Sequence, residues 1–233
     1  LESLFHAQGR LISDISHELR SPLARLSVAL GIARQHTPIE ATVALDRIER
    51  EADRLNQMVE RLLTLSRLEA ASEPQQQVPV QLGEVLREAA ADADFEARSR
   101  NCKVDVRQAD DCTVSGNRNL LRSAIENVLR NAVQYTAPNT TVEVDLRCLA
   151  DGPNRTAQIE VRDYGPGVPE DELQNLFRPF YRLDQSRERQ TGGAGLGLAI
   201  AERAIKLHHG NLEARNVPGG GLLLRITLPA IPT

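Results

Sequence analysis

Aromatic residues, lysines and long apolar runs are scarce in this sequence. Aromatics make up 3% of the 233 residues and tryptophan is absent, so a hydrophobic core has to be built from aliphatic side chains. Lys103 and Lys206 are the only lysines and the formal net charge is −4, which gives no electrostatic reason to expect a nucleic acid or an anionic membrane surface as partner. No run approaches the about 18 apolar residues of a membrane-spanning helix, and no signal-peptide pattern is present.

Cysteine is uninformative as a chemical site. Cys102, Cys112 and Cys148 are odd in number and show no CxxC spacing, so the sequence predicts neither a disulfide framework nor a zinc site. Reduced thiols in the cytosol are therefore expected. Because the first residue is Leu1 rather than Met, we expect the sequence to be part of a longer protein.

Residues 4–68 have the apolar periodicity of two long helices. Apolar residues recur every three or four positions over residues 11–30 and again over residues 45–65. Between these runs, Thr37 can cap the second helix and Pro38 fits its first position. A lone hairpin would leave two apolar stripes unburied, whereas a second copy would complete a four-helix bundle. We therefore predict an all-α antiparallel hairpin that forms a homodimer.

After a polar linker at residues 71–77, the pattern becomes mixed. It predicts strands at 78–80, 103–107, 112–116, 141–149, 156–163, 211–215 and 222–228, and helices at 82–98, 118–135 and 195–208. A turn at 151–154 joins two of the strands. Because strands and helices do not alternate strictly, we expect an α+β domain over residues 78–233, in which helices cover one face of a mixed sheet.

The run SHELRSPL at 16–23 brings together groups that can perform acid–base chemistry. His17 and Ser21 share a helix face, since they are four residues apart. Glu18 can hold a proton on one imidazole nitrogen and so leave the other free as a nucleophile. A surface histidine on a charged helix is the alternative interpretation.

The run ENVLRNAVQY at 126–135 places two amides on one face of a predicted helix. The oxygens of Asn127 and Asn131 converge, and such ligands suit a Mg²⁺ ion that keeps several waters and bridges substrate phosphates. A pair of solvated asparagines is the alternative.

The run DYGPGV at 163–168 follows a predicted strand. The Asp163 carboxylate can accept a hydrogen bond from an exocyclic amine, while the two glycines let the backbone approach a flat ligand. An ordinary turn is the alternative.

A glycine-rich loop, GGAGLGLAI at 192–200, opens a helix. Its backbone N–H groups and the positive end of the helix dipole favour phosphate. The loop lacks the Gly-Lys-Ser/Thr ending of a Walker loop, and no hydrophobic strand precedes it as in a Rossmann turn. Just before it, in LFRPFYR at 176–182, we expect Phe177 and Phe180 to pack and anchor the loop. Arg178 and Arg182 either reach phosphates or are solvated.

In their order and spacing, these runs make the chain resemble the sensor histidine kinases of two-component signalling, over nearly its whole length. The His17 segment resembles the H box, 127–135 the N box and 163–167 the G1 box. Residues 176–182 resemble the F box, 193–197 the G2 box, and 219–221 a final glycine turn. Within the family, ISDISHELR at 12–20 is most similar to the CpxA-type envelope-stress kinases of Gram-negative bacteria.

The resemblance implies a homodimeric phosphotransfer hairpin at residues 1–70 and a GHKL (Bergerat) ATP-binding sandwich at residues 78–233. It also implies that relatives carry transmembrane helices, a periplasmic sensor and a HAMP relay before the hairpin. The whole protein would then lie in the bacterial inner membrane, with this part in the cytoplasm.

Position by position, the resemblance implies that His17 is the phospho-acceptor, Glu18 its general base and Asn131 the principal Mg²⁺ ligand, with Asn127 close by. The Ser21 hydroxyl would orient water to remove phosphate from the partner regulator. The remaining residues implied for the ATP pocket and its lid are Tyr135, Asp163, Gly165, Gly167, Val168, Arg178, Arg182, Gly193, Gly195, Leu196 and Gly197.

Two positions depart from the family pattern. Gln134 stands where relatives usually have Lys or Arg near the phosphates, which weakens phosphate binding unless Arg130, Arg178 or Arg182 compensates. Ser21 replaces the more usual Thr, so the hydroxyl sits on a less constrained side chain.

The resemblance thus implies autophosphorylation of His17 by Mg-ATP and transfer of the phosphoryl group to an aspartate of a response regulator. Because the ATP domain follows a linker, it would have to swing towards His17. Two alternatives stay open: a GHKL ATPase without kinase activity, which has no need of SHELR on a dimeric hairpin, and a degenerate scaffold, which Gln134 alone favours.

Overall fold

The chain divides after Ala70 into a helical unit, Leu1–Ala70, and a sheet unit, Ala71–Thr233. The structure is a computed structural model that describes residues 26, 28, 30–31, 42–71, 77–151, 154–183 and 195–231. Within these residues, no helix combines the length and the apolar character that crossing a bilayer requires.

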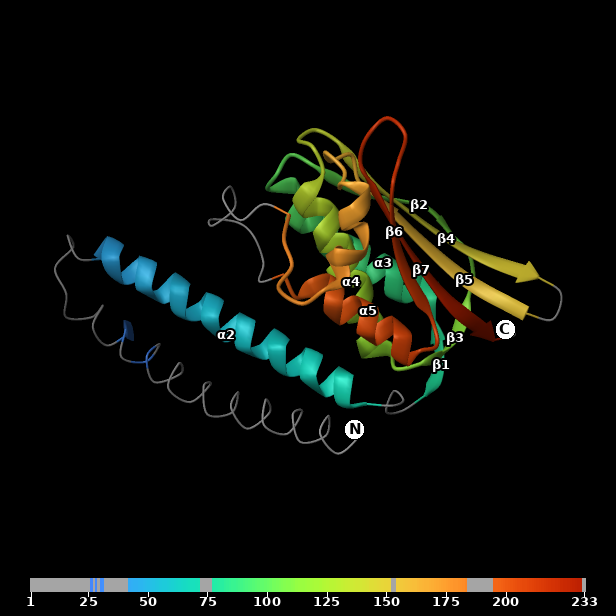
Figure 1. The fold of residues 1–233 in the computed structure, drawn as a ribbon, viewed down its shortest axis with the longest axis horizontal. Coiled ribbons are helices and arrows are strands. Elements are labelled where there is room, and N and C mark those ends of the chain that lie inside the picture. The colour runs from blue at the N-terminus through green and yellow to red at the C-terminus, as the bar shows by residue number, and fades with distance from the viewer. Residues whose placement is uncertain are drawn as a thin grey trace. The chain divides into compact units, whose positions relative to one another are not determined.

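In the helical unit, α2 runs from Thr42 to Ala70 and confirms the second predicted helix (Figure 1). Of the first predicted helix the structure describes four residues, 26, 28, 30 and 31, and all four are helical. The remainder of that helix, the turn near Thr37 and the linker residues 72–76 lie outside the described residues.

The predicted apolar stripe of α2 is only partly covered in the single chain. Ala52 and Leu65 are buried, whereas Ile48 and Leu55 are 46% and 47% exposed. The seven-residue spacing of Ile48 and Leu55 puts them on one side of the helix. This side therefore presents apolar surface that the chain itself does not bury.

Within the described part of the sheet unit, one seven-stranded sheet has the order β1-β3-β7-β5-β4-β2, with β6 also paired to β7. The strands are β1 (Val78–Gln81), β2 (Lys103–Ala109), β3 (Thr113–Gly116), β4 (Thr141–Asp151), β5 (Asn154–Arg162), β6 (Asn211–Asn216) and β7 (Leu222–Ile231). Strands β2 and β4 are parallel, and the other pairs are antiparallel. The predicted mixed sheet is confirmed.

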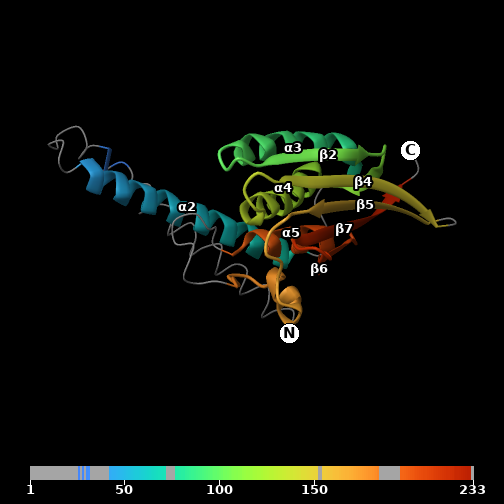
Figure 2. The ribbon, with the colours of Figure 1, turned by 90° about the horizontal axis from the view of Figure 1, so that it is seen from above.

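Helices lie on one face of this sheet (Figures 1 and 2). They are α3 (Leu82–Arg98), α4 (Arg118–Tyr135) and α5 (Gly197–Leu207). The Asn117 side chain caps α4 by accepting from the N–H groups of Asn119 and Leu120. The core between the two layers is aliphatic, as the low aromatic content requires. Its largest fully buried side chains include Leu82, Leu86, Leu121, Ile125, Leu129, Leu146, Ile159, Ile205, Leu224 and Ile226.

Several element boundaries differ from the sequence prediction, most by one or two residues, and one element was not predicted. Strand β2 continues to Ala109, because a bulge between Val106 and Gln108 shifts the alternation without ending the pairing to β4. Strand β7 continues past Pro229, since Ala230 and Ile231 pair with β3. Residues 170–177, for which no element was predicted, form the 3₁₀ helix η2 (Glu170–Phe177).

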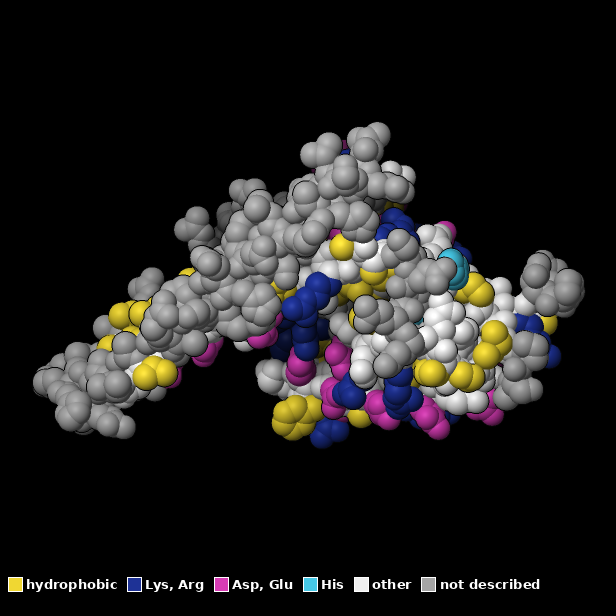
Figure 3. All heavy atoms as spheres, turned by 90° about the horizontal axis from the view of Figure 1, so that it is seen from below, with side chains coloured by type: hydrophobic (Ala, Val, Ile, Leu, Met, Phe, Trp, Pro, Cys, Tyr) yellow, Lys and Arg dark blue, Asp and Glu magenta, His cyan; other side chains and the backbone are white. Residues whose placement is uncertain are grey.

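The described basic and acidic side chains are intermixed on the face drawn in Figure 3. They do not gather into a patch of one sign there. This distribution agrees with the small formal net charge of the chain.

Candidate functional site

Helix α4 carries one row of candidate residues. Asn127, Asn131 and Tyr135 follow each other at intervals of four and therefore share a face. With a rise of 1.5 Å per residue, the row from Asn127 to Tyr135 is about 12 Å long. Other segments of the sheet unit come up to each end of this row.

At the Asn127 end, α4 meets the first residue of α5. The Asn127 amide nitrogen donates to the Ser123 carbonyl (2.8 Å), which directs the amide oxygen away from the helix backbone. A Cβ atom added at Gly197 would lie 2.9 Å from that oxygen. The N-terminus of α5, with its unpaired N–H groups, therefore begins directly beside Asn127.

At the Tyr135 end, α4 is joined to the segment that follows β5. The Tyr164 N–H donates to the Thr136 hydroxyl (3.1 Å), and the Ala137 N–H donates to the Tyr164 carbonyl (3.3 Å). A Cβ atom at Gly165 would lie 2.4 Å from the Tyr135 carbonyl, a distance that only glycine permits. The structure thus brings Tyr135 together with the predicted Asp163–Gly165 turn.

Asp163 is the buried carboxylate of this end, with 3% of its surface exposed. Its Oδ1 atom accepts from the N–H groups of Gly165 (2.8 Å) and Leu222 (3.1 Å). Burial raises the pKa of Asp163 above its ordinary value, although these two hydrogen bonds oppose the shift. Within the described residues, no hydrogen bond engages Oδ2, so this atom can accept from a ligand amine.

Sequence reasoning missed Asn216, the last residue of β6. Its amide oxygen accepts from the Val168 N–H (2.9 Å), and its amide nitrogen donates to the Val168 carbonyl (2.6 Å) and to Glu170 Oε1 (2.8 Å). One side chain thus holds both backbone groups of Val168, which follows Gly167. The partners are 48 residues apart, so no local motif could have indicated this contact.

The prediction that Phe180 packs and anchors the glycine loop is wrong, because this residue is 55% exposed. The link to the loop is made by backbone instead, because the Phe180 N–H donates to the Gly195 carbonyl (2.9 Å). Phe177 and Arg182 are half-buried and Arg178 is exposed. Leu196, which precedes α5, is fully buried.

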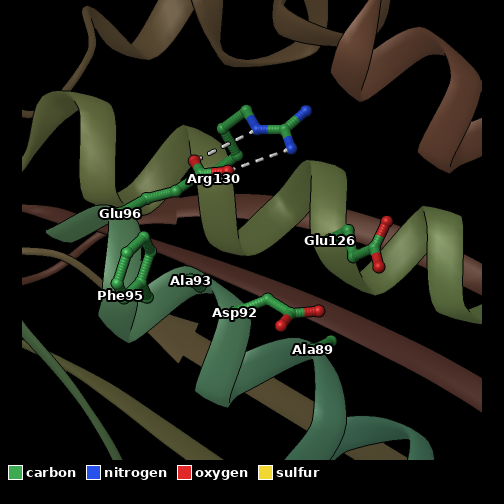
Figure 4. A pocket seen from close by; sticks show the side chains of 7 residues that line it. All are labelled: Ala89, Asp92, Ala93, Phe95, Glu96, Glu126 and Arg130. Atoms are coloured by element: carbon green, nitrogen blue, oxygen red, sulfur yellow. Dashed lines mark hydrogen bonds and ion pairs between the residues drawn. The ribbon is translucent and has the colours of Figure 1, made fainter.

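Arg130 does not belong to the row on α4. It forms an ion pair with Glu96 of α3 (3.4 Å) across a groove of about 350 Å³ between the two helices (Figure 4). The groove is lined by Ala89, Asp92, Ala93, Phe95, Glu96, Glu126 and Arg130. The Arg130 guanidinium therefore lies towards α3. It is not placed where it could supply the positive charge that is missing at Gln134. A different guanidinium lies beside that position, since Arg100 donates to the Gln134 carbonyl (2.9 Å).

Four predicted site residues, His17, Glu18, Ser21 and Gly193, lie outside the described residues. Within the described part of the chain, no group of three or more His, Cys, Asp or Glu side chains could hold a metal ion. The oxygen donors on the α4 row are amides. This donor set fits a Mg²⁺ ion held chiefly by substrate phosphates and water, and does not fit a metal caged by protein carboxylates.

The chain matches family models in both of its units. Residues 7–71 match the His Kinase A (phospho-acceptor) domain, and residues 116–232 match the histidine kinase-, DNA gyrase B-, and HSP90-like ATPase family. The chain belongs to the sensor histidine kinase family. The sensor histidine kinase CpxA of Escherichia coli strain K12 is 40% identical over 98% of this chain and 48% of that protein. The histidine kinase BaeS of the same strain is 35% identical over 94% of this chain and 46% of that protein.

Solved histidine kinase structures share the fold. Full-length ShkA, crystallised with AMPPNP, superposes with a TM-score of 0.77 at 27% identity over 96% of this chain and 46% of that one. The histidine kinase AdeS of Acinetobacter baumannii has a TM-score of 0.64 at 17% identity over 93% of this chain and 98% of that one. The chain spans about half the length of the curated histidine kinases it matches.

Proposed function

We propose that this chain is the kinase part of a two-component sensor: it binds Mg-ATP in the sheet unit, phosphorylates His17 and passes the phosphoryl group to an aspartate of a response regulator. The observation that carries the proposal is the arrangement along α4. A buried carboxylate lies at one end of a row about 12 Å long, and amides beside a helix N-terminus lie at the other. In a purine nucleotide, the hydrogen-bond donor of the base and the negatively charged phosphates are separated by a distance comparable to the length of this row.

The base of ATP binds at the Tyr135 end. Asp163 Oδ2 accepts a hydrogen bond from the exocyclic amine of adenine, while Oδ1 stays bonded to the backbone of Gly165 and Leu222. Tyr135 and Val168 pack on the ring, and Gly165 and Gly167 let the backbone come close to it. Tyr135 is 39% exposed before it receives this partner.

The phosphates bind at the Asn127 end, next to the N-terminus of α5. Gly193, Gly195, Leu196 and Gly197 shape the lid, and N–H groups at the start of α5 face the negative charge. Asn131, with Asn127, would hold Mg²⁺, which when bound neutralises phosphate charge. Arg178 and Arg182 follow η2 and supply cations near the lid.

His17 is the nucleophile of the reaction. Its Nε2 atom attacks the γ-phosphorus, the new N–P bond forms, and the bond from phosphorus to the ADP oxygen breaks. Glu18 holds the proton at Nδ1, so that the lone pair remains on Nε2. The phosphoramidate then donates its phosphoryl group to the regulator aspartate. Ser21 orients the water that later removes this group, so the kinase is also a phosphatase of its regulator.

Homodimerisation of the helical unit completes the enzyme. The exposed stripe with Ile48 and Leu55 packs against a second copy, and the two hairpins form a four-helix bundle that displays His17. Residues 1–70 form the phosphotransfer domain, 71–77 the linker, and 78–233 the ATP-binding domain. In the whole protein, segments outside this chain anchor it in the bacterial inner membrane and leave this part in the cytoplasm.

The proposal is tested by incubating the chain with Mg²⁺ and γ-labelled ATP. We expect phosphate on the protein that is labile in acid and stable in alkali. His17→Gln abolishes labelling and leaves ATP binding unchanged by calorimetry. If this variant still incorporates label, His17 is not the phospho-acceptor. ATP hydrolysis without any labelled protein would instead favour a GHKL ATPase.

Asp163→Asn tests the nucleotide pocket separately. The amide oxygen can still accept from Gly165 and Leu222, whereas the amide nitrogen can no longer accept from adenine. We expect ATP binding to fall below detection in calorimetry. The thermal unfolding temperature should not fall, because a buried charge has been removed. Unchanged ATP affinity would exclude Asp163 as the adenine-binding group.

A further inference from the structure

The 3₁₀ helix η2 has no part in the proposed reaction so far, yet its side chains are bonded towards both ends of the ATP site. None of its residues is buried, so η2 is not needed to close the core. At its first residue, Glu170 Oε1 accepts from the Asn216 amide nitrogen (2.8 Å), and the same Asn216 side chain holds Val168 at the base end. The start of η2 is thereby tied to β6.

Two residues further along η2, Glu172 binds the part of the chain that leads to the phosphate end. Its Oε2 atom accepts from the Tyr181 hydroxyl (2.5 Å) and from the Asn175 amide nitrogen. Hydrogen bonding to Tyr181 lowers the pKa of Glu172, and the same bond raises the pKa of Tyr181 to about 12. At neutral pH a hydroxyl therefore donates to a carboxylate, which is stronger than a hydrogen bond between neutral groups.

Tyr181 is the last residue of a strained turn. Its N–H donates to the Arg178 carbonyl (3.2 Å), and Phe180, the third residue of the turn, has a φ of 64°. A type II turn requires a positive φ at this position and normally has glycine there. A bulky residue keeps such a conformation only where contacts outside the turn hold it. The bond from Tyr181 to Glu172 is one of these contacts.

The turn is joined directly to the segment that opens α5. The Phe180 N–H donates to the Gly195 carbonyl (2.9 Å), and a Cβ atom added at Gly195 would lie 3.0 Å from the Phe180 backbone and from the Tyr181 carbonyl oxygen. Two residues later, Gly197 begins α5 beside Asn127. A displacement of the turn would therefore displace the N–H groups that face the phosphates.

We propose that Tyr181 and Glu172 are positioning residues for phosphate binding: their hydrogen bond holds the turn 178–181 against Gly195 and so fixes the start of α5. Helix η2 then connects this turn to β6, because Asn216 secures its first residue. Neither side chain needs to touch ATP, since both act through the backbone of Gly195. This inference rests on the proposed ATP site in the sheet unit.

The test compares ATP with adenosine, which has the base but lacks the phosphates. In Tyr181→Phe we expect the affinity for Mg-ATP to fall about five- to tenfold by calorimetry. The affinity for adenosine, from a chemical-shift titration by NMR, should change less than about twofold. The unfolding temperature should fall by no more than about 4 °C. Unchanged ATP affinity, or an equal loss for both ligands, would overturn the proposal.

Variants of η2 separate the hydrogen bond from the charge. Glu172→Ala removes the acceptor and should match Tyr181→Phe, and the double variant should bind ATP no more weakly than either single variant, because the same bond is lost. Glu172→Gln keeps an oxygen that can accept from the hydroxyl, so it should bind within about threefold of the native chain.

Asp171→Asn is the matched control for this set. It removes an exposed carboxylate charge next to Glu172, but the Tyr181 hydroxyl donates to Glu172 and keeps its acceptor. We expect normal ATP binding. A loss as large as that of Glu172→Ala would mean that the charge of η2 acts on ATP directly, and it would overturn the role of the bond.

The kinetics of His17 labelling distinguish positioning from a part in the chemical step. In Tyr181→Phe, the KM for ATP should rise about five- to tenfold, while the labelling rate at saturating ATP should change less than about twofold. A fall in this rate at an unchanged KM would overturn the proposal. If the native chain binds neither ATP nor adenosine, the proposed function fails and the positioning role fails with it. If the native chain and Tyr181→Phe bind ATP equally well, only the positioning role fails.

Discussion

The two units of this histidine kinase differ in how far one chain completes its own core. The sheet unit buries its large aliphatic side chains between helices and sheet, and its exposed apolar residues are scattered over separate elements, as with Phe95 on α3 and Leu149 on β4. In the helical unit, Ile48 and Leu55 repeat along one side of α2 and remain about half exposed. A scattered apolar residue needs no partner, whereas a repeating stripe does. The sheet unit thus has a closed core, whereas the described stripe on α2 is the surface that the proposed homodimer would cover.

The largest effect is expected from Leu55→Glu, which places a charge on the α2 stripe. Each dimer receives two such charges, so the dimer dissociation constant should rise at least about 100-fold, as measured by analytical ultracentrifugation. Leu149→Glu is the matched control, because Leu149 has nearly the same exposure (45%) but lies in the sheet unit. If the two variants dimerise equally well, the stripe is not the interface.

The next largest effect concerns the sheet unit alone. His208 is buried between α5 and α4, where its Nδ1–H donates to the Ala204 carbonyl (2.7 Å) and its Nε2 accepts from the Asn117 N–H (3.0 Å). His208→Ala removes both partners and leaves a cavity, so the free energy of unfolding should fall by about 2–3 kcal/mol. We expect the same fall in the Leu55→Glu background, as followed by urea denaturation.

His209→Asn is the control for this experiment. His209 is exposed and has a φ of 56°, a backbone conformation that asparagine tolerates. It should leave the free energy of unfolding within about 0.5 kcal/mol of the native value. A loss as large as that of His208→Ala would contradict the role of the buried ring.

Asn216→Ala should have a smaller effect, confined to nucleotide binding. Without its two hydrogen bonds to Val168, the backbone next to the base becomes more mobile, and ATP affinity should fall about tenfold, equivalent to about 1.4 kcal/mol. Isothermal titration calorimetry measures this change. Asn211→Ala, at the other end of β6, removes only a bond to Glu213 and should bind ATP normally. Equal affinities would show that Asn216 does not position Val168.

The smallest effect is a dependence of stability on pH. Burial lowers the pKa of His208 below its ordinary value of 6.5. As the pH falls through this value, the unfolded chain takes up a proton that the folded chain does not, so the free energy of unfolding decreases. Between pH 7.5 and pH 5.5 the native chain should therefore lose more stability than His208→Gln. If both lose the same amount, His208 is not the group that titrates.

Apolar periodicity was sufficient to predict most elements of this fold, because most of them bury one face. The 3₁₀ helix η2 escaped prediction because it has only eight residues, too few for its apolar spacing to repeat, and none of them is buried. The bulge in β2 was equally invisible, since it changes the register of the strand without changing its composition.

For the candidate site, local motifs identified the residues that lie next to one another in the chain or on one helix. They could not show which neighbouring element each side chain would face. Arg130 looked available for phosphate until the position of α3 placed Glu96 beside it. The contact of Asn216 with Val168 joins segments that are 48 residues apart, and a single sequence does not reveal that they meet.

Helices α4 and α5 are attached to each other at two points. Gly197 touches Asn127 at one point, and His208 accepts from Asn117 at the other. The ten residues between the attachments on α4 and the eleven on α5 correspond to about 15 Å and 16.5 Å, so the antiparallel helices are held in a fixed axial alignment. Sliding by even one residue would break a contact at either point. Any movement of α5 must therefore carry α4 with it, so that Gly197 and Asn127 move together as parts of one rigid body.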